Sequence, residues 1–356
     1  MMRRALALAE RGLGQTSPNP VVGAIVVDAA GTIVGDGYHE RAGTPHAEAH
    51  ALDAAGARAR GATLYCSLEP CCHSGRTGPC VERIVAAGIS RVVAAVADPN
   101  PLVAGQGFAY LRAQGIDVEV GVAGAEAARL NAPFFTFIRH GRPHVTAKAG
   151  VTLDGRIAAR QGERTAITGP DAWRAVHAMR AEVDAIGVGS GTLLVDDPWL
   201  TARDVYRERP LTRVVFDRRL RTPPEARLFS TLEAGPVIIL APAASVAAMP
   251  ARAAALEAAG ARVEPLPDGA LGTALHRLGS LGVMSLLLEG GAALHAAAWE
   301  AGMIDRVVLF VAPVWAGEEG LPLFEGRGPH LSALAGTRVE PVGADVRIEA
   351  DVHRVD

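Results

Sequence analysis

The sequence has few cysteines, no long apolar run and little net charge, and each shortage excludes a class of protein. A formal net charge of -3 over 356 residues supplies no overall basic field for nucleic acid. Apolar runs such as 21–27 and 286–288 are far too short to cross a bilayer. The first residues are basic, but Glu10 and Arg11 interrupt their apolar run, so we expect no secretory signal and a cytoplasmic protein.

The four cysteines are bunched, at positions 66, 71, 72 and 80. Thiols stay reduced in the cytoplasm, so a disulfide framework is not expected there. Bunching of this kind favours metal binding or catalysis instead.

The length and the pattern along the chain predict two α/β domains. Strand and helix signals alternate in both halves, which is typical of largely parallel sheets covered by helices. A helical stretch ends in Gly141-Arg142-Pro143, so we expect one domain at 1–143 and a second at 144–356. The first half is predicted to hold helices at 3–11, 44–55, 78–88 and 107–114 and strands at 21–27, 32–37, 62–68, 91–97 and 117–120. The second half is predicted to hold strands at 144–151, 185–189, 212–217, 237–240, 285–289 and 306–312 and helices at 170–182, 245–259, 270–278 and 292–301.

One histidine, one glutamate and two cysteines form the most informative pattern. His46-Ala47-Glu48 is followed by Pro70-Cys71 and then by Cys80. One imidazole and two thiolates leave tetrahedral zinc an open position for water, as in catalytic sites. Glu48 is suited to move protons between that water and a substrate amine. We therefore predict one zinc ion per chain on His46, Cys71 and Cys80, with Glu48 as the catalytic residue.

The local context supports this prediction. Thr44 is the expected N-cap and Pro45 the first residue of a helix, which places His46 in its first turn. Cys80 lies in the first turn of another predicted helix, whose positive end favours a thiolate. A structural zinc site would need a fourth ligand, and adjacent cysteines chelate one ion poorly, so we interpret Cys72 and Cys66 as non-ligands.

His46-Ala47-Glu48 with Pro70-Cys71 resembles the cytidine-deaminase-like superfamily. Most members place two residues between the cysteines, whereas eight separate Cys71 from Cys80. This spacing resembles the pyrimidine deaminase of riboflavin biosynthesis, as do Thr-Ser-Pro-Asn-Pro at 16–20, Gly-Tyr-His at 37–39 and Asp-Pro-Asn-Pro-Leu-Val-Ala-Gly at 98–105. The family usually has Thr-Pro-Pro-Cys where this chain has Thr-Gly-Pro-Cys at 77–80.

The resemblance implies that a 2-amino group is exchanged for oxygen on 2,5-diamino-6-(5-phosphoribosylamino)pyrimidin-4-one. Polar side chains near the motifs are suited to contact its ring, ribose or phosphate. Asp98 and Asn100 follow a strand, where α/β sheets bind ligands, although their segment is also typical of a turn. Taken singly, each of these side chains fits a turn or a solvated surface equally well. The candidates are Asn19, His39, His73, Arg76, Asp98 and Asn100.

Residues 144–356 resemble the reductase domain of the same family, which has a dihydrofolate-reductase-like fold. The blocks at 148–156 and 187–203 carry this resemblance, and Glu289-Gly290-Gly291 opens a helix whose amides suit a phosphate or form a tight turn. No Gly-x-Gly-x-x-Gly follows the first strand, so a Rossmann domain is not supported. The resemblance implies NADPH contacts from Gly150, Thr192, Asp196, Gly291, Ala292, Ala293, Leu294, His295, Ala296 and Ala297.

The implied reductase reaction is hydride transfer that turns the ribosyl group into ribityl. Its substrate contacts would be Arg180, Leu200, Arg203 and Glu289. Arginines suit bidentate phosphate binding, but without the family Arg180 fits a solvated helix face and Leu200 a core position. The family usually has Ser-x-Trp-Ile-Thr where this chain has Arg-Thr-Ala-Ile-Thr at 164–168. We therefore assign no site role to residues 164 and 166.

Two other interpretations stay open. One is a deaminase of another amino-pyrimidine or purine, of cytidine or tRNA type, with a reductase-like half that has no activity. The cysteine spacing and the lack of a basic surface argue against it. The other is a non-catalytic binding protein, which Ala166 invites and the intact zinc pattern opposes. The resemblance also implies a dimer or larger homo-oligomer with a small-molecule partner and no nucleic-acid or membrane partner.

Overall fold

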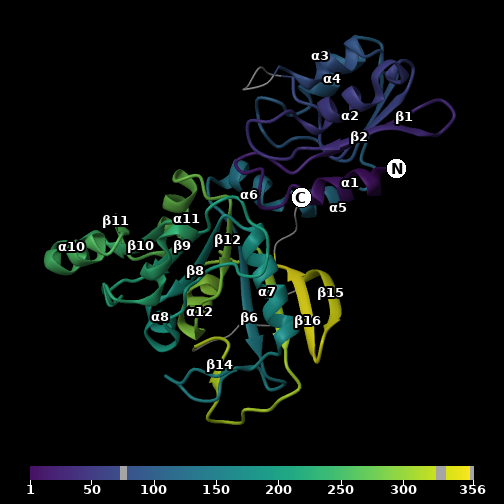
Figure 1. Ribbon diagram of the computed structural model, residues 1–356. Helices are drawn as coiled ribbons and strands as arrows, with labels where there is room; N and C mark the ends of the chain where they lie inside the picture. Colours follow the sequence, from purple (N-terminus) through teal and green to yellow (C-terminus); the bar gives the residue numbers. More distant parts are fainter. Residues whose placement is uncertain (73–77, 326–333, 353–356) are drawn as a thin grey trace. The chain divides into compact units, whose positions relative to one another are not determined.

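The chain was analysed as a computed structural model that describes residues 1–72, 78–325 and 334–352. Two compact units divide it, Met1–Gly141 and Arg142–Arg354 (Figure 1). In the described ranges, no helix combines the length and the apolar character needed to cross a membrane. The candidate residues His73 and Arg76 lie outside the described residues.

The first unit is built on a five-stranded sheet of order β2-β1-β3-β4-β5. Strand β1 pairs antiparallel with β2 and β3, and only the β3–β4 and β4–β5 pairs are parallel. The expectation of a largely parallel sheet is therefore wrong for this unit. The Asp28 carboxylate accepts the N–H groups of Ala30 and Thr32, which closes a turn too short for a parallel crossover. The strands are β1 (Gly23–Val27), β2 (Ile33–Tyr38), β3 (Thr63–Cys66), β4 (Arg91–Ala94) and β5 (Asp117–Val120).

Helices cover both faces of this sheet. They are α1 (Met2–Glu10), α2 (Ala47–Ala55), α3 (Cys80–Ala86), α4 (Gln106–Ala113), α5 (Gly124–Leu130) and α6 (Ala132–His140), with a 3-10 turn at Gly56–Ala59. Helix α2 lies directly on β2, and glycine at position 35 permits this close approach. A Cβ there would come within 2.1 Å of the Ala51 carbonyl oxygen. The glycine thus fixes the helix whose start carries His46.

Helix α2 begins two residues later than the Thr44-Pro45 pattern predicts. Its N-cap is His46, with φ -75° and ψ 165°, so His46 precedes the helix and does not lie in its first turn. Thr44 is used elsewhere, since its hydroxyl donates to the Arg41 carbonyl at 2.7 Å. The extended backbone at His46 leaves its ring beside the helix end. Helix α3 also begins two residues later than its predicted start at 78, at Cys80, with Pro79 as its N-cap.

The second unit holds a nine-stranded sheet of order β11-β10-β9-β8-β12-β6-β13-β16-β15. All pairs from β11 to β13 are parallel, and β16 and β15 add an antiparallel edge. The strands are β6 (His144–Val151), β8 (Ala185–Gly189), β9 (Thr212–Phe216), β10 (Val237–Pro242), β11 (Ala261–Leu266), β12 (Ser285–Leu288), β13 (Arg306–Val311), β15 (Ala335–Val342) and β16 (Asp345–Asp351). A separate two-stranded sheet pairs β7 (Arg156–Ala158) with β14 (Leu321–Pro322).

Helices pack against this sheet (Figure 1). They are α7 (Pro170–Glu182), α8 (Ser190–Asp196), α9 (Ala243–Ala248), α10 (Pro250–Ala258), α11 (Leu271–Ser280) and α12 (Ala292–Glu300), with a 3-10 segment at Arg227–Ala234. The single helix predicted at 245–259 is wrong: the chain forms α9 and α10. Pro250 has no N–H to continue α9 and instead opens α10.

A buried ion pair anchors the start of β6 at the centre of the second unit. The Arg142 guanidinium donates to both Asp305 oxygens, at 2.7 and 2.8 Å, and Asp305 also accepts the Val145 N–H at 2.8 Å. His144 lies between these residues in sequence and is itself buried. Because an unpaired buried charge is costly, this cluster holds the strand in register.

We expect the second unit to lose stability as pH falls from 6.5 toward 4. Burial lowers the pKa of His144, and likewise that of His295, from 6.5 to about 4. Below pH 6.5 the histidines of the unfolded chain bind protons that those of the folded chain do not. The stabilisation from each neutral histidine is therefore fully present above pH 6.5 and is lost as the pH falls to about 4. Each histidine should contribute about 3 kcal/mol. Urea unfolding midpoints across this window measure the slope.

His144→Gln should flatten that slope. His276→Gln, which changes an exposed histidine on α11, is the matched control and should leave it unchanged. A slope in His144→Gln equal to that of the wild type would contradict the account.

Candidate active sites

The first unit brings three predicted ligands together. The ligand atoms of His46, Cys71 and Cys80 all lie within 4.8 Å of one another. His46 Nδ1 is 3.3 Å from Cys80 Sγ and 3.5 Å from Cys71 Sγ. Tetrahedral zinc with ordinary bond lengths separates a nitrogen and a sulfur ligand by about 3.5 Å. Both the donor set and its spacing therefore fit a zinc ion.

The remaining two cysteines have other neighbours. The Cys66 thiol is fully buried and donates to the Leu68 carbonyl. The Cys72 sulfur faces the Leu102 carbonyl at 3.7 Å. Neither belongs to the cluster of candidate ligands among the described residues.

The electrostatics of the cluster favour a thiolate. The backbone N–H of Cys80, at the first residue of α3, donates to Cys71 Sγ at 3.3 Å. The Cys80 thiol and the His46 ring also lower the pKa of Cys71, and the same hydrogen bond to Cys71 raises the pKa of His46. The pKa of Cys80 is raised by Cys71 and by burial, so Cys71 ionises first. Since zinc ligands must be deprotonated, metal binding releases protons here.

Glu48 lies in the first turn of α2, next to the cluster. Its side chain is buried, at 3% exposure. Burial raises the pKa of Glu48 to about 7, and the Cys71 thiolate adds to the effect. A carboxyl group with such a pKa both accepts and releases a proton at neutral pH.

Two predicted substrate residues lie beside the cluster. Asn19 Nδ2 is 3.1 Å from His39 Nε2, and His39 Nδ1 is 3.2 Å from the Pro45 carbonyl oxygen. A carbonyl can only accept, so Nδ1 of His39 is the donor; burial lowers the pKa of this ring, which leaves Nε2 as an acceptor. The His39 and His46 rings meet edge to face, with centroids 5.3 Å apart.

Asp98 and Asn100 follow β4 and make turn hydrogen bonds. Asp98 Oδ1 accepts the Asn100 N–H at 2.8 Å, and Asn100 Oδ1 accepts the Leu102 N–H at 3.1 Å. These contacts match the turn role that the sequence left open for both residues.

Glu69 is a residue whose role the sequence did not reveal. Its carboxylate is buried and accepts the backbone N–H groups of Asp98, Gly105 and Gly107, at 2.9 to 3.1 Å. It thereby ties the turn after β4 to the segment that carries Cys71. The signal was its place directly before Pro70-Cys71, but only the fold shows that backbone amides converge on it.

Glu69→Gln should destabilise the first unit by about 2–4 kcal/mol. The new amide would keep one acceptor oxygen and turn a donor NH2 group toward backbone N–H groups, which leaves buried donors unpaired. Urea unfolding of the full chain measures the loss. Glu82→Gln makes the same change at an exposed position of α3 and should have little effect; a loss of equal size in both variants would contradict the role of Glu69.

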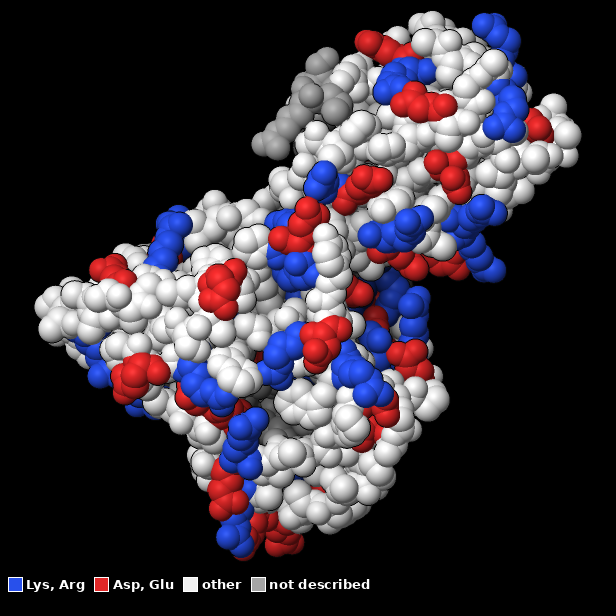
Figure 2. All heavy atoms as spheres, viewed as in Figure 1, with Lys and Arg blue, Asp and Glu red and all other residues white. Residues whose placement is uncertain are grey.

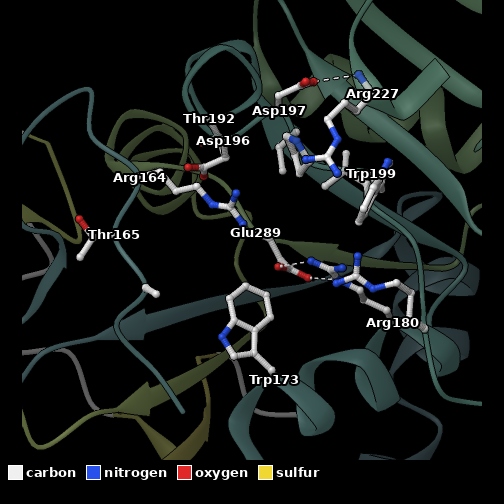
Figure 3. A pocket seen from close by; sticks show the side chains of 15 residues that line it. Arg164, Thr165, Trp173, Arg180, Thr192, Asp196, Asp197, Trp199, Arg227 and Glu289 are labelled. Atoms are coloured by element: carbon white, nitrogen blue, oxygen red, sulfur yellow. Dashed lines mark hydrogen bonds and ion pairs between the residues drawn. The ribbon is translucent and has the colours of Figure 1, made fainter. Parts of the chain in front are cut away.

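The second unit contains two adjoining hollows. The first hollow has a volume of about 400 Å³ (Figure 3). It is lined by all four substrate residues predicted for the reductase, Arg180, Leu200, Arg203 and Glu289. The second hollow has a volume of about 480 Å³ and is lined by Gly150, Thr192, Asp196, Gly291, Ala292, Ala293 and Leu294. Thr165, Trp173, Thr192, Asp196 and Glu289 line both.

Three predicted cofactor residues are not brought to either hollow. His295 and Ala296 are buried, and Ala297 is exposed elsewhere on α12. Successive helix residues point in different directions, so the first turn of α12 faces the second hollow and the following residues turn away.

A buried ion pair lies where the two hollows meet, because Glu289 lines both, Arg180 the first and Lys148 the second. Arg180 donates to both Glu289 oxygens, at 2.8 and 3.0 Å, and Lys148 Nζ lies 3.4 Å from the same carboxylate. Burial alone would raise the pKa of Glu289, but the two cations outweigh it and lower the pKa to about 2. Glu289 is thus ionised and already offsets the charge of Arg180.

Arg203 and Arg227 also line the first hollow, together with the acids Asp196 and Asp197. The Arg203 backbone N–H donates to His177 Nδ1 at 3.1 Å. Its guanidinium lies 5.1 Å from the ring centre of Trp199, and that of Arg227 lies 3.8 Å from it. Residues 164 and 166, which carry the departure from the family pattern, also line this hollow. Four further residues that the sequence did not indicate line the hollows: Lys148, Trp173, Trp199 and Arg227.

The visible face formed by the described residues carries no extended charged surface of the kind that binds nucleic acid. Figure 2 shows basic and acidic side chains interspersed there in both units, without an extended field of one sign.

Comparisons with known proteins agree with this geometry. The protein-family model of the RibD C-terminal domain matches residues 143–348 of this chain. The family model of the cytidine and deoxycytidylate deaminase zinc-binding region matches residues 1–96. The RibD riboflavin biosynthesis protein of Aquifex aeolicus is 44% identical over 317 residues, 89% of this chain and 87% of that protein. Its counterpart in Escherichia coli is 40% identical over 324 residues, 89% and 88% of the two chains.

Solved structures are similar over almost the full length. Acinetobacter baumannii RibD superposes with a TM-score of 0.86 at 35% identity, covering 99% of this chain and 98% of that one. A Thermotoga maritima diaminohydroxyphosphoribosylaminopyrimidine deaminase/5-amino-6-(5-phosphoribosylamino)uracil reductase gives 0.84 at 33% identity, covering 99% and 97%.

Proposed function

This chain belongs to the RibD family of riboflavin biosynthesis, as a bifunctional deaminase and reductase, and from that premise we propose which residues carry each activity. The family membership supports two activities over a deaminase with an inactive second half. We propose that residues 1–143 are the deaminase domain and 144–356 the reductase domain.

In the deaminase domain, the proposed substrate is 2,5-diamino-6-(5-phosphoribosylamino)pyrimidin-4-one. One zinc ion per chain, held by His46, Cys71 and Cys80, would supply Lewis acidity toward water. Glu48 would take a proton from the attacking water, deliver it to a ring nitrogen and help the amine leave. Asn19 and His39 would orient the ring, since their polar atoms already converge beside the cluster. The contacts proposed for Asp98, Asn100, His73 and Arg76 stay predictions.

In the reductase domain, we place NADPH in the second hollow and the phosphoribosyl substrate in the first. The observation that carries this is that five residues line both hollows, so the hollows adjoin and a hydride donor in one can meet an acceptor in the other. Gly291 is the N-cap of α12, and a Cβ there would lie 3.1 Å from Thr192 Oγ1. Bare backbone at a helix start suits a cofactor phosphate. Roles for His295, Ala296 and Ala297 would have to be indirect.

A fluorescence titration of the full chain with NADPH tests the reductase assignment. Saturable binding that ribose 5-phosphate does not displace is expected, because cofactor and substrate occupy different hollows. The absence of saturable binding would overturn the assignment.

Arg203→Met should raise the KM for the reduction about 10- to 100-fold and leave NADPH affinity unchanged. Because Glu289 already offsets Arg180, Arg203 would be a main source of positive charge for the substrate phosphate. Steady-state kinetics with the phosphoribosylaminouracil substrate measure the change. Arg219→Met, at an exposed arginine, is the control; an unchanged KM in Arg203→Met would contradict the assignment.

A further inference from the structure

One face of α7 lies beside the hollows, and its residues Trp173 and Arg180 line them. Trp173, His177 and Arg180 follow each other at intervals of four and three residues, so they form one stripe along the helix. Arg180 holds Glu289, and His177 lies 3.2 Å from the Arg203 guanidinium. Trp173 lies in the first turn, with Lys148 Nζ 5.9 Å from its ring centre. Ala172 and Val176, on the neighbouring face, pack into the core with Val308 and Phe310 and fix the rotation of the helix.

Two tryptophans line the first hollow, and they differ in what covers them. Arg203 and Arg227 both lie over the ring of Trp199. Trp173 is 40% exposed and lines both hollows, beside Glu289 (Figure 3). Thr165 and Ala166, which line the first hollow nearby, bring no ring. Trp199 is similarly exposed, at 37%, but Lys148 Nζ lies 5.9 Å from the Trp173 ring centre, farther than either arginine lies from that of Trp199. Trp173 therefore offers the more open aromatic face, and it offers that face at both hollows.

The spacing along α7 matches the proposed substrate. Trp173 and Arg180 are seven positions apart, which corresponds to a rise of about 10 Å along the helix axis. This is comparable to the span from the phosphate to the base in a phosphoribosylamino pyrimidine. A substrate with its phosphate at Arg203, near the Arg180 end of the stripe, and its ribosyl group beside Lys148 and Glu289 would thus present its base at Trp173.

We propose that Trp173 stacks on the pyrimidine ring of the reductase substrate and positions the ribosyl carbon for hydride transfer. This proposal rests on the proposed function. It assigns the base of the substrate to Trp173, at the N-terminal end of the stripe on α7. Stacking on an aromatic side chain depends on the flat face of the base and tolerates its polar edge. Trp173 is a positioning residue and takes no part in proton or hydride transfer.

The test compares two ligands in the full chain. The KM of the phosphoribosylaminouracil substrate for reduction and the inhibition constant of ribose 5-phosphate, which lacks the base, are measured for wild type, Trp173→Ala and Trp173→Phe. Trp173→Ala should raise the KM about 5- to 100-fold. The ribose 5-phosphate constant and the NADPH dissociation constant should stay within about twofold, the ordinary scatter of a surface change. Trp173→Phe should keep most of the affinity.

Trp315→Ala is the matched control, since Trp315 is 73% exposed and lines neither hollow; it should match the wild type. An equal rise in the ribose 5-phosphate constant would overturn the proposal, because the effect would then not come from the base. A rise confined to the NADPH constant would assign Trp173 to the nicotinamide and overturn it as well. If the wild type fails to oxidise NADPH with this substrate, the proposed function fails, and this proposal with it.

Discussion

Glu48→Gln should lower the rate of deamination by about 10²- to 10⁴-fold, the usual contribution of a positioned acid or base. Glutamine keeps the shape of the side chain but cannot accept and return a proton. The carboxyl group is buried beside the ligand cluster, so bulk water cannot substitute for it. Zinc content should stay at the wild-type level, because Glu48 does not belong to the candidate ligands.

The reduction provides an internal control in the same molecule. NADPH-dependent turnover of the phosphoribosylaminouracil should be unchanged in Glu48→Gln, because the two hollows lie in the other unit. Glu82→Gln should retain both activities. A Glu48→Gln variant that deaminates at the wild-type rate with zinc bound would contradict the proton-transfer role.

Cys80→Ser should lose its zinc and, with it, the deamination. Loss of an outer-shell contact alone weakens metal binding about 10- to 100-fold, so loss of a direct thiolate should exceed that range. Cys80 also begins α3, and its N–H supports the Cys71 sulfur, so the variant keeps this hydrogen bond while removing a ligand. Metal analysis by mass spectrometry of the intact protein, together with the deamination rate, measures the effect.

Cys72→Ser is the matched control, because it changes a thiol next to a ligand that faces a carbonyl instead of the cluster. It should keep zinc and both activities. Zinc loss in Cys72→Ser, or full zinc occupancy in Cys80→Ser, would show that the ligand set differs from His46, Cys71 and Cys80.

The sequence predicted the elements that carry strong periodicity. The order of strands and helices that places Cys80 and Arg180 agrees with the structure, and α7 has the predicted bounds. The fold class follows the family resemblance and is confirmed by the domain matches and the similar structures. The antiparallel pairs of β1 were missed because the expectation rested on the alternation of strands and helices, whereas the short turn at 28–32 requires β1 and β2 to pair antiparallel.

The remaining parts of the site depend on contacts distant in sequence. Glu69 gains its role from amides nearly 40 positions away, which no local pattern shows. No local pattern around Trp173 indicates a site residue, because it lines the two hollows only once α7 is packed on the sheet. The start of α2 differs for a local reason: the Thr44 hydroxyl donates to the Arg41 carbonyl, and His46 is the N-cap. Assembly into a dimer or larger homo-oligomer stays a prediction.

The most direct test of two activities in one chain follows the substrate by mass. Purified zinc-replete protein is incubated with 2,5-diamino-6-(5-phosphoribosylamino)pyrimidin-4-one, with and without NADPH. The account predicts a gain of about 1 Da without NADPH, from exchange of amine for oxygen, and a further gain of about 2 Da with it, from reduction. A first gain without the second would contradict an active reductase domain, and the absence of both with zinc bound would contradict the substrate itself.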